Sequence, residues 1–319
     1  MVNSSAETWY SRSFEETNRM LHEAKQRARA QCALPLAAAP QETRPATLLK
    51  TLHGGWCYGT PEASGIHEEC KPVRASVRPT CRVRLPNQQS FLLPRYHDIA
   101  DPEIVDALAI LLQEKSSGAA GDPVFLSLLD LGAGVGQLGH ALLARDLRYR
   151  YMGYDGAGDV EAFTRGFIRY VDLSLQLSLR RADWVASLAV GEHVPSSNEL
   201  AVVRNLHAHN CRGIILNWGS IALPGHGHIN CHSKQYLLEV FIGLGYRVDH
   251  ELTMALRQGN PRLLLTRMGN QGTIKFHEAP KEEAGHHWFR EDTTIAFRRI
   301  VPLHGSGCTT LNGGGSVSA

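Results

Sequence analysis

The stretch Val124–Gly139, VFLSLLDLGAGVGQLG, decides how the rest of the chain is interpreted. An apolar run ends at Asp130, and Gly132, Gly134 and Gly136 follow at every second position. Apolar residues then continue at helical spacing. A buried strand, a glycine turn and the start of a helix are typical of the nucleotide-binding unit of a doubly wound sheet.

Strand and helix patterns alternate on both sides of this stretch. We expect strands at 124–131, 149–154, 167–171, 183–188 and 213–218, and helices at 101–115, 137–145, 159–167, 198–209 and 233–244. The segments 247–256 and 293–300 are expected to form a final antiparallel pair of strands. This alternation predicts an α/β fold, a doubly wound and mainly parallel seven-stranded sheet of Rossmann-like type.

The chain divides into three parts. Residues 1–100 are expected to form an N-terminal helix at 14–31 and an irregular extension, because no sustained period follows the helix. Residues 101–303 contain the alternating elements and form the main domain. The polar block 257–292 is either a lid or a disordered loop, and the Gly/Ser-rich residues 304–319 are expected to be a disordered tail.

The charge and hydropathy of the whole chain argue against some classes of partner. The net charge of +2 and the lack of basic patches with interleaved aromatic residues argue against nucleic acid. No apolar run approaches the roughly 20 residues of a membrane span, and the first residues lack a signal-peptide pattern. The expected compartment is the cytoplasm by default, or a lumen if a signal was trimmed, and the oligomeric state is left open.

Seven cysteines are present, and none of them forms a CxxC pair. This spacing argues against a zinc ribbon or a thioredoxin-type site. Cys57, Cys70 and Cys81 lie in one loop-rich stretch, where they are either ordinary thiols or members of a disulfide.

The glycine pattern is G-x-G-x-G, whereas dinucleotide-binding turns use G-x-G-x-x-G. Together with Asp130 it resembles motif I of class I S-adenosylmethionine-dependent methyltransferases. Asp155 ends the second strand, where a carboxylate can accept hydrogen bonds from ribose hydroxyls. The resemblance implies that Asp172, at the end of the third strand, faces the adenine amino group. The predicted cofactor is S-adenosyl-L-methionine, bound by Asp130, Gly132, Gly134, Gly136, Gln137, Asp155, Gly156 and Asp172.

The candidate catalytic residues follow the fourth strand, in the run DWVASLAVGEHVP. This run resembles the E-x-x-E-H and E-H-V/I-P motifs of ubiquinone-type O-methyltransferases and of small-RNA 2′-O-methyltransferases. In the RNA enzymes, two glutamates, this histidine and a later histidine hold a divalent metal. Here Ala189 stands at the first glutamate position. Glu192 and His193 are either an acceptor-side acid/base pair, with the imidazole as proton acceptor, or residues that cap the following helix or hold a loop in place.

A histidine-rich loop follows the fifth strand. His226 and His228 could enter one pocket, and His228 or His232 could join Glu192 and His193 as a metal ligand. The alternative is that these histidines only form hydrogen bonds. The predicted catalytic residues, which are also the metal candidates, are Glu192, His193 and His228. We expect His207 and His209 to be structural.

Four longer runs resemble one family: YDGAGDVEAF, DWVASLAVGEHVP, NLHAHNCRGIILNW and GHGHINCHSKQYLLEVFIGLGY. They are similar to the eukaryotic methyltransferase-like 24 type proteins over about Leu129–Tyr246. In that family the position of Ala189 is usually glutamate. The substrates of the family are poorly defined, so the resemblance supports fold and cofactor more than acceptor.

Three functions follow from these motifs. The leading one is methyl transfer to an O or N acceptor on a small molecule, a sugar or a side chain. The alternatives are a metal-dependent 2′-O-methyltransferase of small RNA and a catalytically inactive cofactor-binding protein.

Overall fold

The computed structural model describes residues 16, 19–27, 30, 49–50, 56–57, 80–84, 90–94, 102–114, 124–146, 148–158, 160–222, 228–258, 264 and 293–309. The expectations for His226, Cys70 and most of the block 257–292 lie outside these residues, as do those for the side chains of Cys57 and Cys81. In the described part of the chain, every helix is too short or too polar to cross a membrane.

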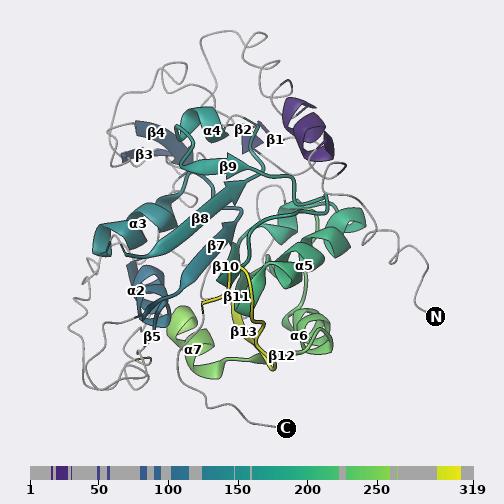
Figure 1. Ribbon diagram of the computed structural model, residues 1–319. Helices are drawn as coiled ribbons and strands as arrows, with labels where there is room; N and C mark the ends of the chain where they lie inside the picture. Colours follow the sequence, from purple (N-terminus) through teal and green to yellow (C-terminus); the bar gives the residue numbers. More distant parts are fainter. Residues whose placement is uncertain are drawn as a thin grey trace.

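A seven-stranded sheet forms the centre of the molecule (Figure 1). Its order is β12-β13-β11-β10-β7-β8-β9. The strands, in this order, are Tyr246–Val248, Ile295–Arg299, Asn210–Asn217, Ala182–Leu188, Ser127–Leu131, Arg150–Asp155 and Ile168–Tyr170. The pairs β11–β10, β10–β7, β7–β8 and β8–β9 are parallel, and β13 is antiparallel to both of its neighbours. The predicted doubly wound, mainly parallel seven-stranded sheet is confirmed.

Helices cover both faces of this sheet (Figure 1). On one face lie α2, α3 and α7, which span Pro102–Leu111, Gln137–Arg145 and His250–Gln258. On the other lie α5 and α6, which span Glu199–Ala208 and Lys234–Gly243. The short helix α4 is Val160–Phe163, and two 3-10 turns span Gly191–His193 and Ser196–Asn198.

Alternating strand residues divide the core into two layers. Leu128 and Trp184 point toward α2, α3 and α7, whereas Leu129 and Val185 point toward α5 and α6. All four side chains are fully buried. Because parallel strands bury both faces, they contain continuous apolar runs, which is why the sequence predicts them well.

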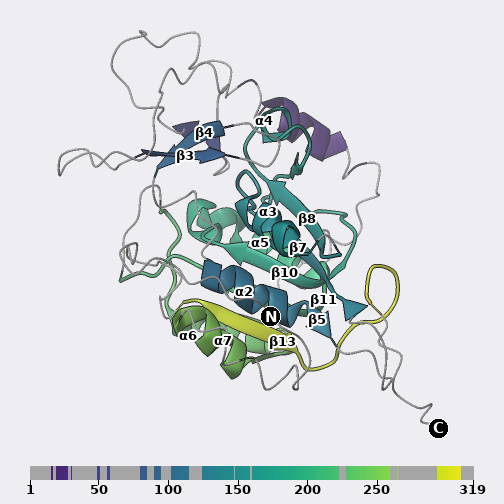
Figure 2. The same ribbon diagram turned by 90° about the vertical axis from the view of Figure 1, so that its left-hand side faces the viewer.

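Smaller strand pairs lie outside the main sheet. They are β1 with β2 (Leu49–Lys50 and Trp56–Cys57), β3 with β4 (Thr80–Arg84 and Ser90–Pro94), and β5 with β6 (Gln113–Glu114 and Val124–Phe125). The predicted N-terminal helix is helical at residues 16, 19–27 and 30. Figure 2 shows this helix beside α4.

The expectation of one strand over 247–256 is wrong in its second half. A strand ends at Val248, and α7 begins at His250. Asp249 starts this helix, because its carboxylate accepts the Leu252 N–H at 3.1 Å and its carbonyl accepts the Thr253 N–H. The second predicted strand is β13, and it pairs antiparallel with β12 as expected.

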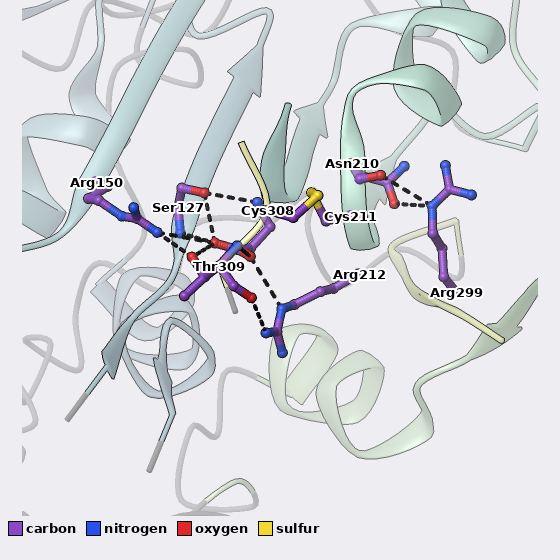
Figure 3. Close-up of polar contacts among 9 residues, drawn as sticks. Ser127, Arg150, Asn210, Cys211, Arg212, Arg299, Cys308 and Thr309 are labelled. Atoms are coloured by element: carbon purple, nitrogen blue, oxygen red, sulfur yellow. Dashed lines mark hydrogen bonds and ion pairs between the residues drawn. A yellow bond between two sulfur atoms is a disulfide. The ribbon is translucent and has the colours of Figure 1, made fainter. Parts of the chain in front are cut away.

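The described residues 304–309 differ from the expected disordered tail (Figure 3). Cys308 forms a disulfide with Cys211 of β11. Gly305 and Gly307 have φ of 111° and 91°, which only glycine adopts readily, so they allow the chain to turn toward Cys211. The glycines that suggest disorder in the sequence therefore shape a fixed turn.

Thr309 then reaches the amino ends of the central strands. Its N–H and Oγ1 donate to the buried carboxylate of Asp183 at 2.8 and 2.6 Å. The same carboxylate accepts from Ser127 and lies beside Arg150 and Arg212. Burial opposes the ionisation of Asp183, but the hydrogen bonds from Ser127 and Thr309 outweigh it and lower its pKa. We call the disulfide and the Asp183 contacts the C-terminal clasp.

Candidate functional site

The glycine turn after β7 is built so that only glycine fits. Gly132, Gly134 and Gly136 have φ of 92°, 58° and 89°. A Cβ on Gly132 would lie 2.1 Å from a methyl carbon of Val190, and one on Gly136 would lie 2.6 Å from the ring of Phe167. The turn is therefore a compact backbone surface at the carboxyl edge of the sheet, where open α/β sheets bind ligands.

Asp155 lies beside this turn at the end of β8. One carboxylate oxygen accepts the Gly134 N–H and the other accepts the Ala157 N–H, both at 2.8 Å. Gly156 lies between Asp155 and Ala157 in the segment that leaves the strand. The two backbone donors fix the carboxylate at the strand end and stabilise its charge.

Asp172 follows the neighbouring strand β9 and is also buried. Its carboxylate accepts the N–H and the hydroxyl of Ser174 at 2.9 and 2.6 Å. The Val171 N–H donates to the Asp155 carbonyl at 2.9 Å, so the two acids leave adjacent strands side by side. The structure thus brings Asp155 and Asp172 to the same edge as the glycine turn.

Asp130 is in β7, directly before the glycine turn, and is almost completely buried. Its carboxylate accepts the hydroxyl of Tyr151 at 2.7 Å. Burial raises its pKa to about 7, Tyr151 opposes this shift, and the charge of Asp155 adds to it. Gln137 begins α3 on the other side of the turn.

A second group of side chains follows β10 and β11. One possible ligand atom each from Glu192, His193 and His228 can be chosen so that all three lie within 4.8 Å of one another. His228 Nε2 lies 3.9 Å from Glu192 Oε1, and the two imidazole rings meet edge to face at 5.1 Å between centroids. Glu192 and His193 are buried, and His228 is partly exposed. We call these three residues the acceptor cluster.

The local backbone brings the acceptor cluster together. Ala189, directly after β10, has a left-handed φ of 55°, and the 3-10 turn Gly191–His193 follows it. The carbonyl of Glu192 accepts the Ile229 and Asn230 N–H groups at 2.8 and 3.1 Å, which fixes the His228 loop against this turn.

Gly219 leaves space for these side chains. A Cβ at this position would lie 2.8 Å from the Glu192 Cβ and 3.0 Å from His228 Nδ1. The glycine is therefore needed for the close approach of the two loops.

Glu199 holds the far end of the His228 loop, a role that the sequence did not indicate. Its carboxylate accepts from Asn230 Nδ2 at 3.1 Å, from His232 Nε2 at 2.6 Å and from the Tyr236 hydroxyl. Burial alone would raise the pKa of Glu199, but the hydrogen bonds from Tyr236, His232 and Asn230 together lower it. We call this arrangement the Glu199 anchor.

These contacts show which histidines belong to the acceptor cluster and which do not. His228 belongs to the acceptor cluster, whereas His232 pairs with Glu199. His209 Nδ1 donates to the Asn205 carbonyl at 2.7 Å and Nε2 accepts the Leu179 N–H at 3.1 Å, so this side chain is structural, as predicted. His207 lies 3.2 Å from the Tyr246 hydroxyl, and burial lowers its pKa to about 4.

The turn and the acceptor cluster adjoin one another. Val190, whose methyl carbons pack over Gly132, lies two residues before Glu192. A ligand on the glycine turn and a ligand on the acceptor cluster would therefore be neighbours on the carboxyl edge of the sheet.

Comparisons with known proteins give structural matches only. No family model and no curated protein matches the sequence. Magnesium protoporphyrin IX methyltransferase (ChlM) from Synechocystis PCC 6803, with bound SAH, is 18% identical over 46% of this chain and 74% of its own, with a TM-score of 0.36.

Two further solved structures have similar scores. The 1,6-didemethyltoxoflavin-N1-methyltransferase of Burkholderia thailandensis is 17% identical over 57% of this chain and 89% of its own, with a TM-score of 0.33. The small RNA methyltransferase HEN1 is 16% identical over 46% of this chain and 22% of its own, with a TM-score of 0.37. Because these identities and TM-scores are low, the fold is assigned from the strand order and register of the sheet.

Proposed function

We propose that this chain is a class I S-adenosylmethionine-dependent methyltransferase. Its acceptor, an oxygen or nitrogen atom of another molecule, binds beside Glu192, His193 and His228. The observation that carries the proposal is the contact of Val190 with Gly132, which places the acceptor cluster next to the predicted donor turn. The narrower resemblance to methyltransferase-like 24 type proteins is part of this proposal and rests on the four sequence runs alone, since no curated protein matches the chain.

The donor half uses the glycine turn and the strand-end acids. The positive φ values of the three glycines shape the G-x-G-x-G turn, whose backbone lies beside the strand-end acids. A carboxylate accepts several hydrogen bonds, so Asp155 can bind ribose hydroxyls while its backbone donors hold it in place. The proposal assigns Asp172, which follows the neighbouring strand β9, to the adenine amino group.

The acceptor half supplies orientation and a site for a proton. In methyl transfer, the acceptor lone pair forms a bond to the methyl carbon while the carbon–sulfur bond breaks, and S-adenosylhomocysteine leaves. The acceptor then loses its proton, which His193 can take as a neutral imidazole. Because this is an in-line displacement, holding the two ligands in the right geometry supplies much of the rate acceleration.

The acceptor cluster also fits a divalent cation. Two imidazoles and one carboxylate, with ligand atoms within 4.8 Å of one another, are a donor set that suits zinc, iron or manganese. In this alternative Glu192, His193 and His228 would hold the ion, and His193 would act as a ligand instead of as the proton acceptor. A bound cation would lower the pKa of an acceptor hydroxyl.

Calorimetry with S-adenosylmethionine and S-adenosylhomocysteine tests the donor half. We expect both to bind, and Asp155→Asn to weaken binding by about tenfold, the loss expected when charge-assisted hydrogen bonds are removed. If the wild-type protein binds neither compound, the proposal is wrong.

A screen for S-adenosylhomocysteine release, with phenolic, sugar, peptide and small-RNA acceptors, tests the acceptor half. His193→Ala and His228→Ala should abolish turnover, whereas the exposed His250→Ala at the start of α7 should not change it. Metal analysis of the same variants tests the cation, since His193→Ala should lose bound metal and His250→Ala should retain it. Turnover that survives His193→Ala would refute the assigned role.

A further inference from the structure

The N-terminal helix, described at residues 19–27, packs against the elements that carry the predicted donor site. It lies beside α4 (Figure 2), and Lys25 of this helix contacts Glu161 of α4. Helix α4 and strand β9 belong to the segment between Asp155 and Asp172. The helix is therefore next to the ribose–adenine side of the predicted site.

Apolar packing joins this helix to the glycine turn. Ala24 is only 2% exposed, and it belongs to one buried cluster with Ala133 and Ala157. Ala133 lies between the first two glycines of the turn, and Ala157 donates its N–H to Asp155. Leu21, one helical turn before Ala24, packs against the same cluster. One face of the helix is thus buried in the same cluster as these two donor-site alanines.

An ion pair fixes the helix to α4. The ammonium group of Lys25 contacts one carboxylate oxygen of Glu161, and the other oxygen accepts the Tyr170 N–H at 3.0 Å. Both charged side chains are about three-quarters buried. Tyr170 precedes Asp172 by two residues, so this contact connects the helix to the strand that presents the adenine-side acid.

Arg27 adds a second electrostatic contact on the same side. Burial and the charge of Asp172 raise the pKa of Tyr170, and the positive charge of Arg27 opposes this rise. The helix therefore brings two cations to the α4–β9 region, next to the acids at the strand ends.

We propose that this helix forms one wall of the S-adenosylmethionine site, on its ribose–adenine side, and that the cofactor binds tightly only while the helix is docked. This inference rests on the proposed function. The observed affinity then equals the intrinsic affinity multiplied by the docked fraction. Any change that undocks the helix must weaken cofactor binding, although no donor-site residue has been altered.

The test measures S-adenosylhomocysteine affinity by calorimetry in full-length variants. Lys25→Glu places a negative charge against Glu161, and we expect the Kd to rise about tenfold. Lys25→Arg keeps the positive charge beside Glu161 and should retain most of the affinity. The matched control is Arg19→Glu, which breaks only the exposed pair with Glu23 on the same helix and should leave the Kd unchanged.

Hydrogen exchange gives a second readout that needs no variant. Amide exchange of residues 19–27 in the wild-type protein should slow when S-adenosylhomocysteine is added. If the wild type binds the compound but this exchange is unchanged, or if Lys25→Glu binds as well as or better than the wild type, the inference is wrong and the proposed function stands. If the wild type does not bind, both are wrong.

Discussion

At the scale of single residues, the ionisation of Asp130 depends strongly on folding. Its carboxyl group is buried beside Tyr151, with a pKa of about 7 in the folded protein and an ordinary value of 3.8. At a pH between these two pKa values, Asp130 is ionised in the unfolded chain and protonated in the folded protein. This group therefore contributes stability at low pH, and the contribution is lost as the pH rises from about 4 to about 7.

Asp130→Asn tests this behaviour, since the amide does not ionise. Relative to the wild type, the variant should gain unfolding free energy as the pH is raised from 4 to 8, measured by urea denaturation. Asp146→Asn is the control, because a hydrogen bond from exposed Arg148 lowers the pKa of Asp146 and restricts its effect to more acidic solutions. A difference between Asp130→Asn and the wild type that is the same at every pH would contradict the assigned burial effect.

At the scale of elements, the Glu199 anchor controls the position of the His228 loop. Glu199→Gln keeps the shape but removes the charge that holds His232 and Tyr236. We expect about tenfold weaker metal binding at the acceptor cluster, the usual effect of losing an outer contact that orients a ligand. Glu239→Gln, which alters an acid on the exposed side of α6, should bind metal like the wild type.

Metal titration monitored by calorimetry measures this difference. The result that would contradict the anchor role is equal affinity in Glu199→Gln and the wild type. Loss of metal binding in Glu239→Gln as well would show that the effect is not specific to the anchor.

Sequence patterns predicted those helices and strands in which burial requires a regular spacing of apolar residues. The strand at β7 and the helix Gln137–Arg145 follow from the apolar run, the glycines and the helical spacing. The strand predicted over 247–256 is wrong after Val248, because α7 begins at His250. Asp249 is a helix-capping residue type, and the first turn of α7 follows from it.

The candidate site was predictable in part, for the same reason. Glu192, His193 and His228 stand at loop positions where a doubly wound sheet collects ligands, so topology alone brings them together. The Glu199 anchor joins α5, α6 and the loop through side-chain contacts that have no sequence period. The disulfide was missed because Cys211 and Cys308 are 97 residues apart, and their pairing depends on the final packing.

At the scale of the whole molecule, the C-terminal clasp fastens residues 303–309 to the sheet edge opposite the donor turn. Cys211→Ser with Cys308→Ser should lower the unfolding free energy by about 4 kcal/mol, because the disulfide closes a long loop in the unfolded chain. Thermal unfolding should shift down by about 10 °C. Cys231→Ser, which changes a cysteine outside the disulfide, is the control. An unchanged melting temperature in the double variant would contradict the clasp.

The same disulfide turns residues 211–308 into a covalent ring that contains α6, α7, β12 and β13. A protease that cuts once inside this ring therefore opens it without separating the pieces. After limited trypsin digestion we expect a nicked species that migrates as one full-length band on a non-reducing gel and as two fragments once a reductant is added. Two fragments under both conditions would mean that the ring is not closed. A protein built in this way can lose the continuity of its backbone and still remain a single molecule.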